Sequence, residues 1–177
     1  MKKFLGILGI IITFFIIYFL QVNFFNWFTI AGIKPNLFIV LILVIGLFAG
    51  KKIGAIMGLI FGIYLDILFG KSIGFSGIIL MCIGFIGGYL DKTFSKDSKL
   101  TIILTVLGGT IVYELITYIY NVIKFSMLFE FGLFIKILFI ELVFNTLLTI
   151  ILYPIIQKLG YKLEIIFKQD KILTRYF

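Results

Sequence analysis

Three acidic side chains stand inside long apolar stretches of the sequence, namely Asp66, Glu114 and Glu141. An ionisable group is costly in such surroundings, so each acid requires a partner, local water or a function. A carboxylate there can relay protons, bind a small ligand, contact a polar group of a partner's membrane helix, or hydrogen-bond to a neighbouring helix of the same chain. The other residue types in the chain narrow this choice.

The chain lacks the residue types that most enzymatic reactions require. There is no histidine and one cysteine, Cys82, which excludes an intrachain disulfide, a Cys/His zinc site and a Ser-His or Cys-His nucleophile. An aspartyl protease needs two acids that share a proton, whereas Asp66 and Asp91 are expected at opposite ends of their helices. We therefore predict a protein that is not an enzyme and holds no metal or cofactor.

The composition places the acids in a membrane. Apolar and aromatic residues make up 62% of the 177 residues and charged residues 14%, whereas soluble domains have about 45–50% and about 25%. Mean hydropathy is +1.24. The chain is expected to form one domain in a bilayer.

Charged clusters divide the sequence into six apolar stretches. They are residues 4–20, 35–49, 53–69, 73–90, 100–123 and 133–156. Because a crossing needs about 20 residues, the second and third stretches are short. We predict an all-α membrane protein with six transmembrane helices in residues 1–157. A basic amphipathic cytoplasmic tail is predicted in residues 158–177, where cations among apolar side chains suit contact with anionic membrane lipids.

The distribution of basic residues predicts the orientation. With the N-terminus in the cytoplasm, 12 of the 16 Lys and Arg residues fall on the cytoplasmic side, Lys34, Lys71 and Lys124 fall outside, and Lys136 lies within the last stretch. Such asymmetry in short loops orients membrane proteins. Both termini are therefore predicted to be cytoplasmic. The net charge of +8 then reports orientation and lipid contact, and no nucleic-acid partner is expected.

Glycines recur every fourth residue in the third stretch, at Gly54, Gly58 and Gly62. Small residues on one helix face let a neighbouring backbone approach closely, so we predict a helix-packing surface, more readily within this fold than with another protein. Asp66 continues that face by one turn. Its carboxylate is expected either to fix the following turn, by accepting backbone hydrogen bonds or pairing with Lys71, or to contact a ligand or partner.

Polar residues also recur at helical spacing in the last two stretches. The fifth stretch carries Thr110, Glu114, Thr117, Tyr118 and Asn121, and the sixth carries Glu141, Asn145 and Thr149. Each set forms one stripe on a helix. The two stripes are expected to face each other or a shared cavity, where they could serve as interhelical hydrogen-bond contacts, a proton relay, a ligand cavity or a contact for a partner's helix.

Two motifs together resemble a known family. Lys34, Pro35, Asn36 and Leu37 open the second stretch, and the glycine series runs through Asp66 to Gly70 and Gly74. This pattern resembles the bacterial rod-shape-determining MreD family, with Pro35, Asn36, Asp66, Gly70 and Gly74 as the motif positions. Pro154 before the basic tail also fits. The specific part of the resemblance lies in residues 34–77.

The resemblance implies a non-enzymatic, multi-pass scaffold in the bacterial cytoplasmic (inner) membrane. Such a scaffold acts in cell elongation, and so in rod shape and peptidoglycan synthesis, and it binds MreC through membrane and outer-face contacts. MreB and peptidoglycan synthases are further implied partners. The resemblance also implies a bundle similar to the S-component of energy-coupling-factor transporters.

Two alternatives follow from these observations. The chain could be the substrate-binding S-component of a vitamin transporter, with a ligand near Glu114 and Glu141. Against this, S-components are expected to carry a small-x3-small motif on the first span, whereas Gly6 and Gly9 are three residues apart and residues 4–20 contain no alanine. The second alternative is proton-coupled transport through Glu141.

Overall fold

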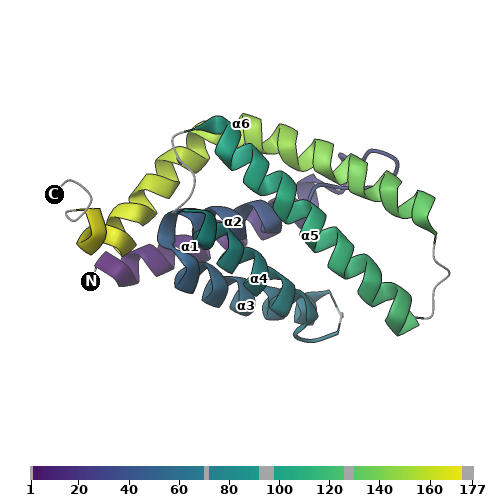
Figure 1. The fold of residues 1–177 in the computed structure, drawn as a ribbon, viewed down its shortest axis with the longest axis horizontal. Helices are drawn as coiled ribbons and strands as arrows, with labels where there is room; N and C mark the ends of the chain where they lie inside the picture. The colour runs from purple at the N-terminus through teal and green to yellow at the C-terminus, as the bar shows by residue number, and fades with distance from the viewer. Residues whose placement is uncertain (1, 70–71, 92–97, 126–129, 173–177) are drawn as a thin grey trace.

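In the part of the chain that the structure describes, the regular elements are helices. The computed structural model describes residues 2–69, 72–91, 98–125 and 130–172, and for Phe125 and residues 169–172 the backbone alone (Figure 1). The helices are α1 (Lys2–Phe19), which continues into the π-helical turn η1 (Leu20–Phe24), α2 (Leu37–Ala49), α3 (Lys51–Leu68), α4 (Phe75–Leu90), α5 (Lys99–Phe125) and α6 (Phe131–Ile172). The predicted all-α class is confirmed.

Within the described ranges, three segments are long and apolar enough to cross a membrane, namely Lys2–Phe24, Lys99–Lys124 and Phe131–Lys168. The apolar helices α2 and α4 have 13 and 16 residues, so α2 is about 20 Å long at about 1.5 Å per residue. Length and composition thus support a helical membrane protein. The exact six-helix topology stays a prediction.

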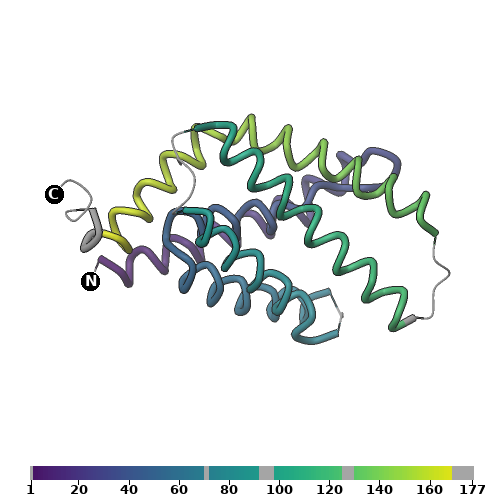
Figure 2. Tube along the Cα trace, in the orientation of Figure 1, coloured from purple at the N-terminus to yellow at the C-terminus, as the bar shows by residue number. Residues whose placement is uncertain are grey.

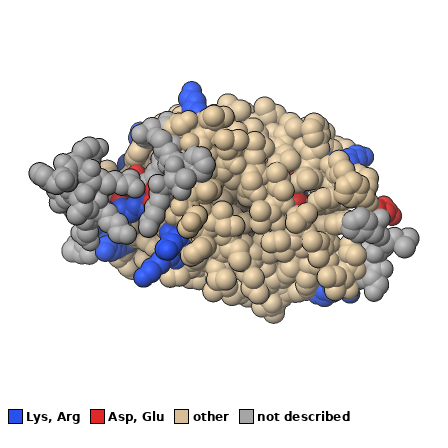
Figure 3. Space-filling model, in the orientation of Figure 1, with Lys and Arg blue, Asp and Glu red and all other residues tan. Residues whose placement is uncertain are grey.

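The chain returns to the end at which it started. The beginning of α1 and the last turns of α6 lie at the same end of the molecule, whereas the end of α5 and the start of α6 lie at the other, with the end of α3 turned toward it (Figures 1 and 2). Basic residues gather at the end with the termini, while the broad middle of the visible face is nearly free of charge (Figure 3). This distribution suits a bundle that stands across a bilayer.

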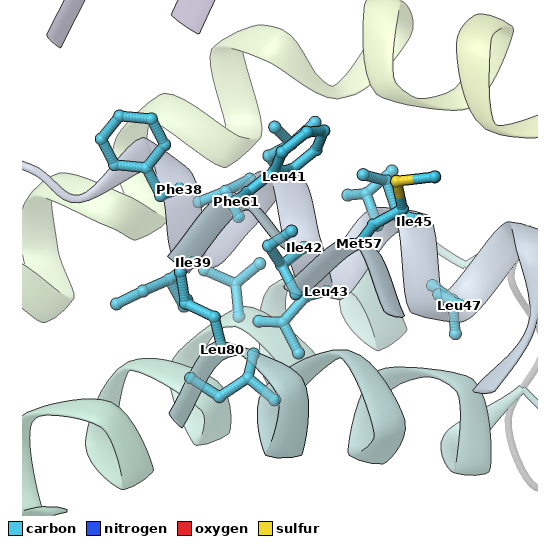
Figure 4. Packing of buried hydrophobic residues seen from close by; sticks show 14 of the residues in the cluster. Phe38, Ile39, Leu41, Ile42, Leu43, Ile45, Leu47, Met57, Phe61 and Leu80 are labelled. Atoms are coloured by element: carbon cyan, nitrogen blue, oxygen red, sulfur yellow. The ribbon is translucent and has the colours of Figure 1, made fainter. Parts of the chain in front are cut away.

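Helix α2 forms the centre of the bundle, because all its 13 residues are buried. It packs against α1, α3, α4, α5 and α6. A helix that is apolar on every side is stable when other helices surround it. Figure 4 shows Leu41, Ile42 and Leu43 of α2 in the same cluster as Phe61 of α3 and Leu80 of α4.

The glycine face of α3 packs against α4. A Cβ atom at Gly54 would lie 2.6 Å from the carbonyl oxygen of Gly84, and one at Gly58 or Gly62 would overlap the backbone of Leu80 or Gly77. No side chain fits in these gaps, so the two backbones touch directly. The glycines at 54, 58 and 62 therefore serve contacts within the chain in this structure.

Helix α6 runs without a break from residue 131 to 172 and contains Pro154. A proline within a helix lacks a donor and bends the axis, and α6 changes direction between its green and yellow halves (Figure 1). The second half crosses the terminal end of the bundle. There a Cβ at Gly6 would lie 2.9 Å from Ile166, and one at Gly160 would lie 2.6 Å from Phe48. The helix thus continues through residue 158. The division of the chain there, into a transmembrane part in residues 1–157 and a cytoplasmic tail in residues 158–177, stays a prediction.

Substitution of Gly58 by leucine should destabilise the protein, because its side chain must push α3 and α4 apart. Overpacking costs about 1–3 kcal/mol or more. The matched control is Gly9→Leu on α1, where a Cβ meets no atom within 4 Å. Thermal unfolding of both variants in detergent should show a lower midpoint for Gly58→Leu alone, and equal midpoints would contradict the packing described here.

Candidate functional site

The motif residues Pro35 and Asn36 stand directly before α2, where a helix leaves backbone N–H groups without partners. The N–H of Asn36 donates to Oδ1 of Asn145 on α6 over 2.8 Å. The N–H of Leu37 donates to Oε1 of Gln21 in η1 over 3.2 Å, and Gln21 also donates from Nε2 to the carbonyl oxygen of Pro35. Two side chains from other helices thus cap the buried start of α2.

Asn145 connects three helices and has no exposed surface. Its Nδ2 donates to Oγ1 of Thr110 on α5 over 3.0 Å, while its Oδ1 accepts from Asn36. Oγ1 of Thr149 donates to the carbonyl oxygen of Asn145 over 2.6 Å. The polar stripes of α5 and α6 therefore meet at Thr110 and Asn145. Because its carboxamide is engaged inside the fold, Asn145 is placed to hold α2, α5 and α6 together.

Asp66 is fully buried near the end of α3. Its Oδ2 accepts the N–H of Ser76, in the first turn of α4, over 3.0 Å. A carboxylate near a helix N-terminus is stabilised by the free N–H groups and the helix dipole. Gly74, which precedes α4, has φ of +91°, a conformation that suits glycine. Asp66 thus caps the helix after the turn.

Two other positions named with this turn, Gly70 and Lys71, lie outside the described residues. The structure therefore does not place the Asp66–Lys71 pair. Oδ1 of Asp66 has no hydrogen-bond partner among the residues that are described. A buried carboxylate with one oxygen unpaired is a costly arrangement, so Asp66 remains a candidate for a further contact.

Tyr113 of α5 is a member of this site that the sequence patterns did not reveal. Its side chain interacts with those of Asn36, directly before α2, and Ser76, in the first turn of α4. It lies three residues after Thr110, and residues at this spacing share a helix face. This spacing could have revealed Tyr113, but a tyrosine in an apolar stretch is equally typical of a membrane-interface residue.

The acids Glu114 and Glu141 lie close enough to Tyr113 to act on it electrostatically. Glu141 is buried, one helical turn before Asn145, and Glu114 is half-buried. The structure thus brings the acids of α5 and α6 to one region. Within the described residues, no group of three or more His, Cys, Asp or Glu side chains could hold a metal ion.

The other end of α2 is closed by Lys168, from the second half of α6. Its Nζ donates to the carbonyl oxygen of Leu47 over 3.0 Å and forms an ion pair with Oδ2 of Asp91 over 2.6 Å. Carbonyl groups at a helix C-terminus favour a cation. Asp91 therefore pairs with Lys168 at the end of the bundle opposite Asp66. Because the two acids lie at opposite ends, they form no catalytic pair.

These contacts define a class of protein, namely a helical membrane protein whose polar side chains close the ends of a buried helix. The chain belongs to the MreD family, since the family model for the rod shape-determining protein MreD matches residues 1–163. It is thus a membrane protein of rod-shape determination, in a family of structural proteins that is not a known enzyme family. No curated protein and no solved structure matches the chain.

The family assignment confirms the resemblance drawn from the proline and glycine motifs. The described motif residues share a structural position, because each stands where a helix begins or ends. Pro35 and Asn36 precede α2, Asp66 lies near the end of α3, and Gly74 precedes α4. The motif thus marks the two turns that bring these helices together.

Replacing Asn145 by leucine should destabilise the fold by about 1–3 kcal/mol, because the N–H of Asn36 and the hydroxyl of Thr110 lose their buried partner. Asn23→Leu is the control, since Asn23 is exposed and its Nδ2 donates to the carbonyl oxygen of Phe19, one turn earlier in the same helical segment. Thermal unfolding in detergent measures both. Equal midpoints would show that Asn145 does not hold the start of α2.

Proposed function

We propose that this protein is a non-enzymatic, multi-pass scaffold of the cell-elongation machinery in the bacterial cytoplasmic membrane, and that it binds MreC. The observation that carries the proposal is the family match over residues 1–163. The site supports it, because the polar groups of Asn145, Thr110 and Gln21 bond to other parts of the fold. A scaffold needs such a rigid interior and an accessible surface for its partners.

The proposed topology has six membrane-crossing helices with both chain ends in the cytoplasm. The gathering of basic residues at the end with the termini supports it (Figure 3). In this topology the segment between η1 and α2 and the turn between α3 and α4 face outward. The last part of α6, around Lys162, lies at the cytoplasmic lipid surface, as the sequence predicts for residues 158–177.

The outward segment offers a contact surface for MreC. Trp27 has an exposed fraction of 88%, and the rings of Phe24 and Phe28 stack with centroids 4.7 Å apart. Ile30 and Ile33 close a tight turn through two backbone hydrogen bonds of 3.0 and 2.9 Å. Exposed aromatic residues on an ordered turn are frequent anchors in protein interfaces. We propose that MreC contacts this segment in addition to membrane helices, and that MreB and peptidoglycan synthases join through the same assembly.

The transporter alternatives need an accessible polar cavity or a proton path. Glu114 and Glu141 would supply the ligand or proton contact in an S-component or a proton-coupled transporter. The arrangement around them favours the scaffold, because the neighbouring Asn145 and Thr110 bond to each other. A saturable thermal shift with a vitamin, or proton-dependent flux that Glu141→Gln abolishes, would reverse this order.

Depletion of the protein in a rod-shaped host should produce rounded cells, and the tagged protein should co-purify with MreC from membranes. Trp27→Ala should lower the recovery of MreC, because it removes the most exposed aromatic ring of the outward segment. The control is Ile73→Ala in the turn before α4, where the exposed fraction is 76%. Normal cell shape together with no MreC recovery would contradict the proposal.

A further inference from the structure

Oδ1 of Asp66 on α3 and Oγ1 of Thr117 on α5 are buried oxygens that have no hydrogen-bond partner among the described residues. Asp66 has no exposed surface, and its other oxygen, Oδ2, already accepts the N–H of Ser76. A buried polar atom without a partner is costly, so each of the two oxygens requires an explanation.

The hydroxyl of Thr117 behaves differently from that of other buried threonines in these helices. A threonine inside a helix can donate its hydroxyl to the carbonyl oxygen four residues earlier. Thr105 donates in this way to Thr101 over 2.8 Å, and Thr149 donates to Asn145 over 2.6 Å. The hydroxyl of Thr117 forms no such bond within its own helix. It is therefore available to a group on another element.

Thr117 lies on the face of α5 that contacts the start of α4. The side chain of Tyr113 interacts with that of Ser76, and the rings of Tyr120 and Phe75 stack with centroids 3.7 Å apart. Thr117 stands four residues after Tyr113 and three before Tyr120. Residues at these spacings share one helix face, so Thr117 is placed between the two tyrosines at this contact.

Asp66 reaches the same contact from α3. Its Oδ2 bonds to Ser76, and its charge acts on Tyr120. A carboxylate oxygen needs a hydrogen-bond donor, and the hydroxyl of Thr117 can both donate and accept. The two groups are thus complementary, but no direct bond joins Oδ1 of Asp66 to Oγ1 of Thr117. A small group that donates and accepts fits between them.

The chemistry of these two oxygens favours water as the connecting group. A buried water molecule makes about three hydrogen bonds to polar groups that would otherwise be unpaired. It can donate to the carboxylate and accept from the hydroxyl, and the hydroxyl of Tyr113 is a third polar group on the same face of α5. An apolar occupant would leave both oxygens unpaired.

We propose that one buried water molecule bridges Asp66 and Thr117, donating to Oδ1 of the carboxylate and accepting from the hydroxyl. Such a bridge is nearly as favourable in enthalpy as a direct hydrogen bond. It links α3 to α5 and completes the hydrogen bonds of Asp66, beside the turn that contains Gly74. The water is thus a structural ligand of the bundle, and this assignment depends on neither the proposed topology nor MreC.

NMR on the full chain in detergent micelles tests this proposal through magnetisation transfer from water to the amide hydrogen of Ser76. This amide bonds to the same carboxylate, so a water on Oδ1 lies close to it. Measurement in the rotating frame separates direct contact with a long-lived water from proton exchange, because the two give signals of opposite sign. The wild-type protein should show the contact signal.

Thr117→Val should weaken this contact signal severalfold, because it removes the hydroxyl and nearly keeps the shape of the side chain. The matched control is Thr105→Val, which changes a buried threonine of the same helix that bonds to its own backbone. Thr105→Val should keep the signal. Thr117→Ser should also keep it, which separates loss of the bridge from a change in packing.

Two results would overturn the proposal. The first is an absent contact signal at Ser76 in the wild-type protein, or a signal that is unchanged in Thr117→Val. The second is a saturable rise of the unfolding midpoint with sodium chloride, but not with choline chloride, that Thr117→Val abolishes. That second result would assign the position between Asp66 and Thr117 to a cation.

Discussion

The structure depends on one constraint, which is that a helix buried on all sides must satisfy the backbone groups at both its ends. Helix α2 meets this constraint with side chains from distant parts of the chain. Gln21 and Asn145 accept from the first N–H groups, and Lys168 donates to a carbonyl oxygen near the last turn. These bonds lie in buried or half-buried surroundings, where a backbone group needs a partner from the protein. The positions of η1 and α6 follow from the need to bring these side chains to α2.

Packing elsewhere in the bundle depends on glycine residues at the helix contacts. Lipid gives helices no hydrophobic drive to associate, so close backbone contact and buried hydrogen bonds must hold the bundle. The glycine faces of α3 and α4 supply the first, and the Asp66–Ser76 and Asn145–Thr110 bonds supply the second. A rigid interior of this kind leaves the lipid-facing surfaces and the exposed segment before α2 for partners. The proposed scaffold role uses this surface.

Local patterns in the sequence predicted the helices and the family, because hydropathy and glycine spacing act within one helix. The network around α2 was beyond such patterns. Asn36 and Asn145 are 109 residues apart and Leu47 and Lys168 are 121 apart, so each pair is defined only when the helices are assembled. The sequence identified Asn145 as a polar stripe residue, but its bond to the start of α2 could not be read from one helix. Likewise, Lys168 was counted as one of many basic residues, and its role depends on the bend of α6 that brings it back to the bundle.

The most direct test of this account is hydrogen exchange at the start of α2, measured by NMR on the protein in detergent micelles. The amide hydrogens of Asn36 and Leu37 should exchange orders of magnitude more slowly than that of Phe28 in the exposed segment, because buried side chains accept from them. Gln21→Leu should speed the exchange of Leu37 more than that of Asn36. Exchange at Asn36 and Leu37 as fast as at Phe28 would contradict the claim that side-chain caps close the central helix.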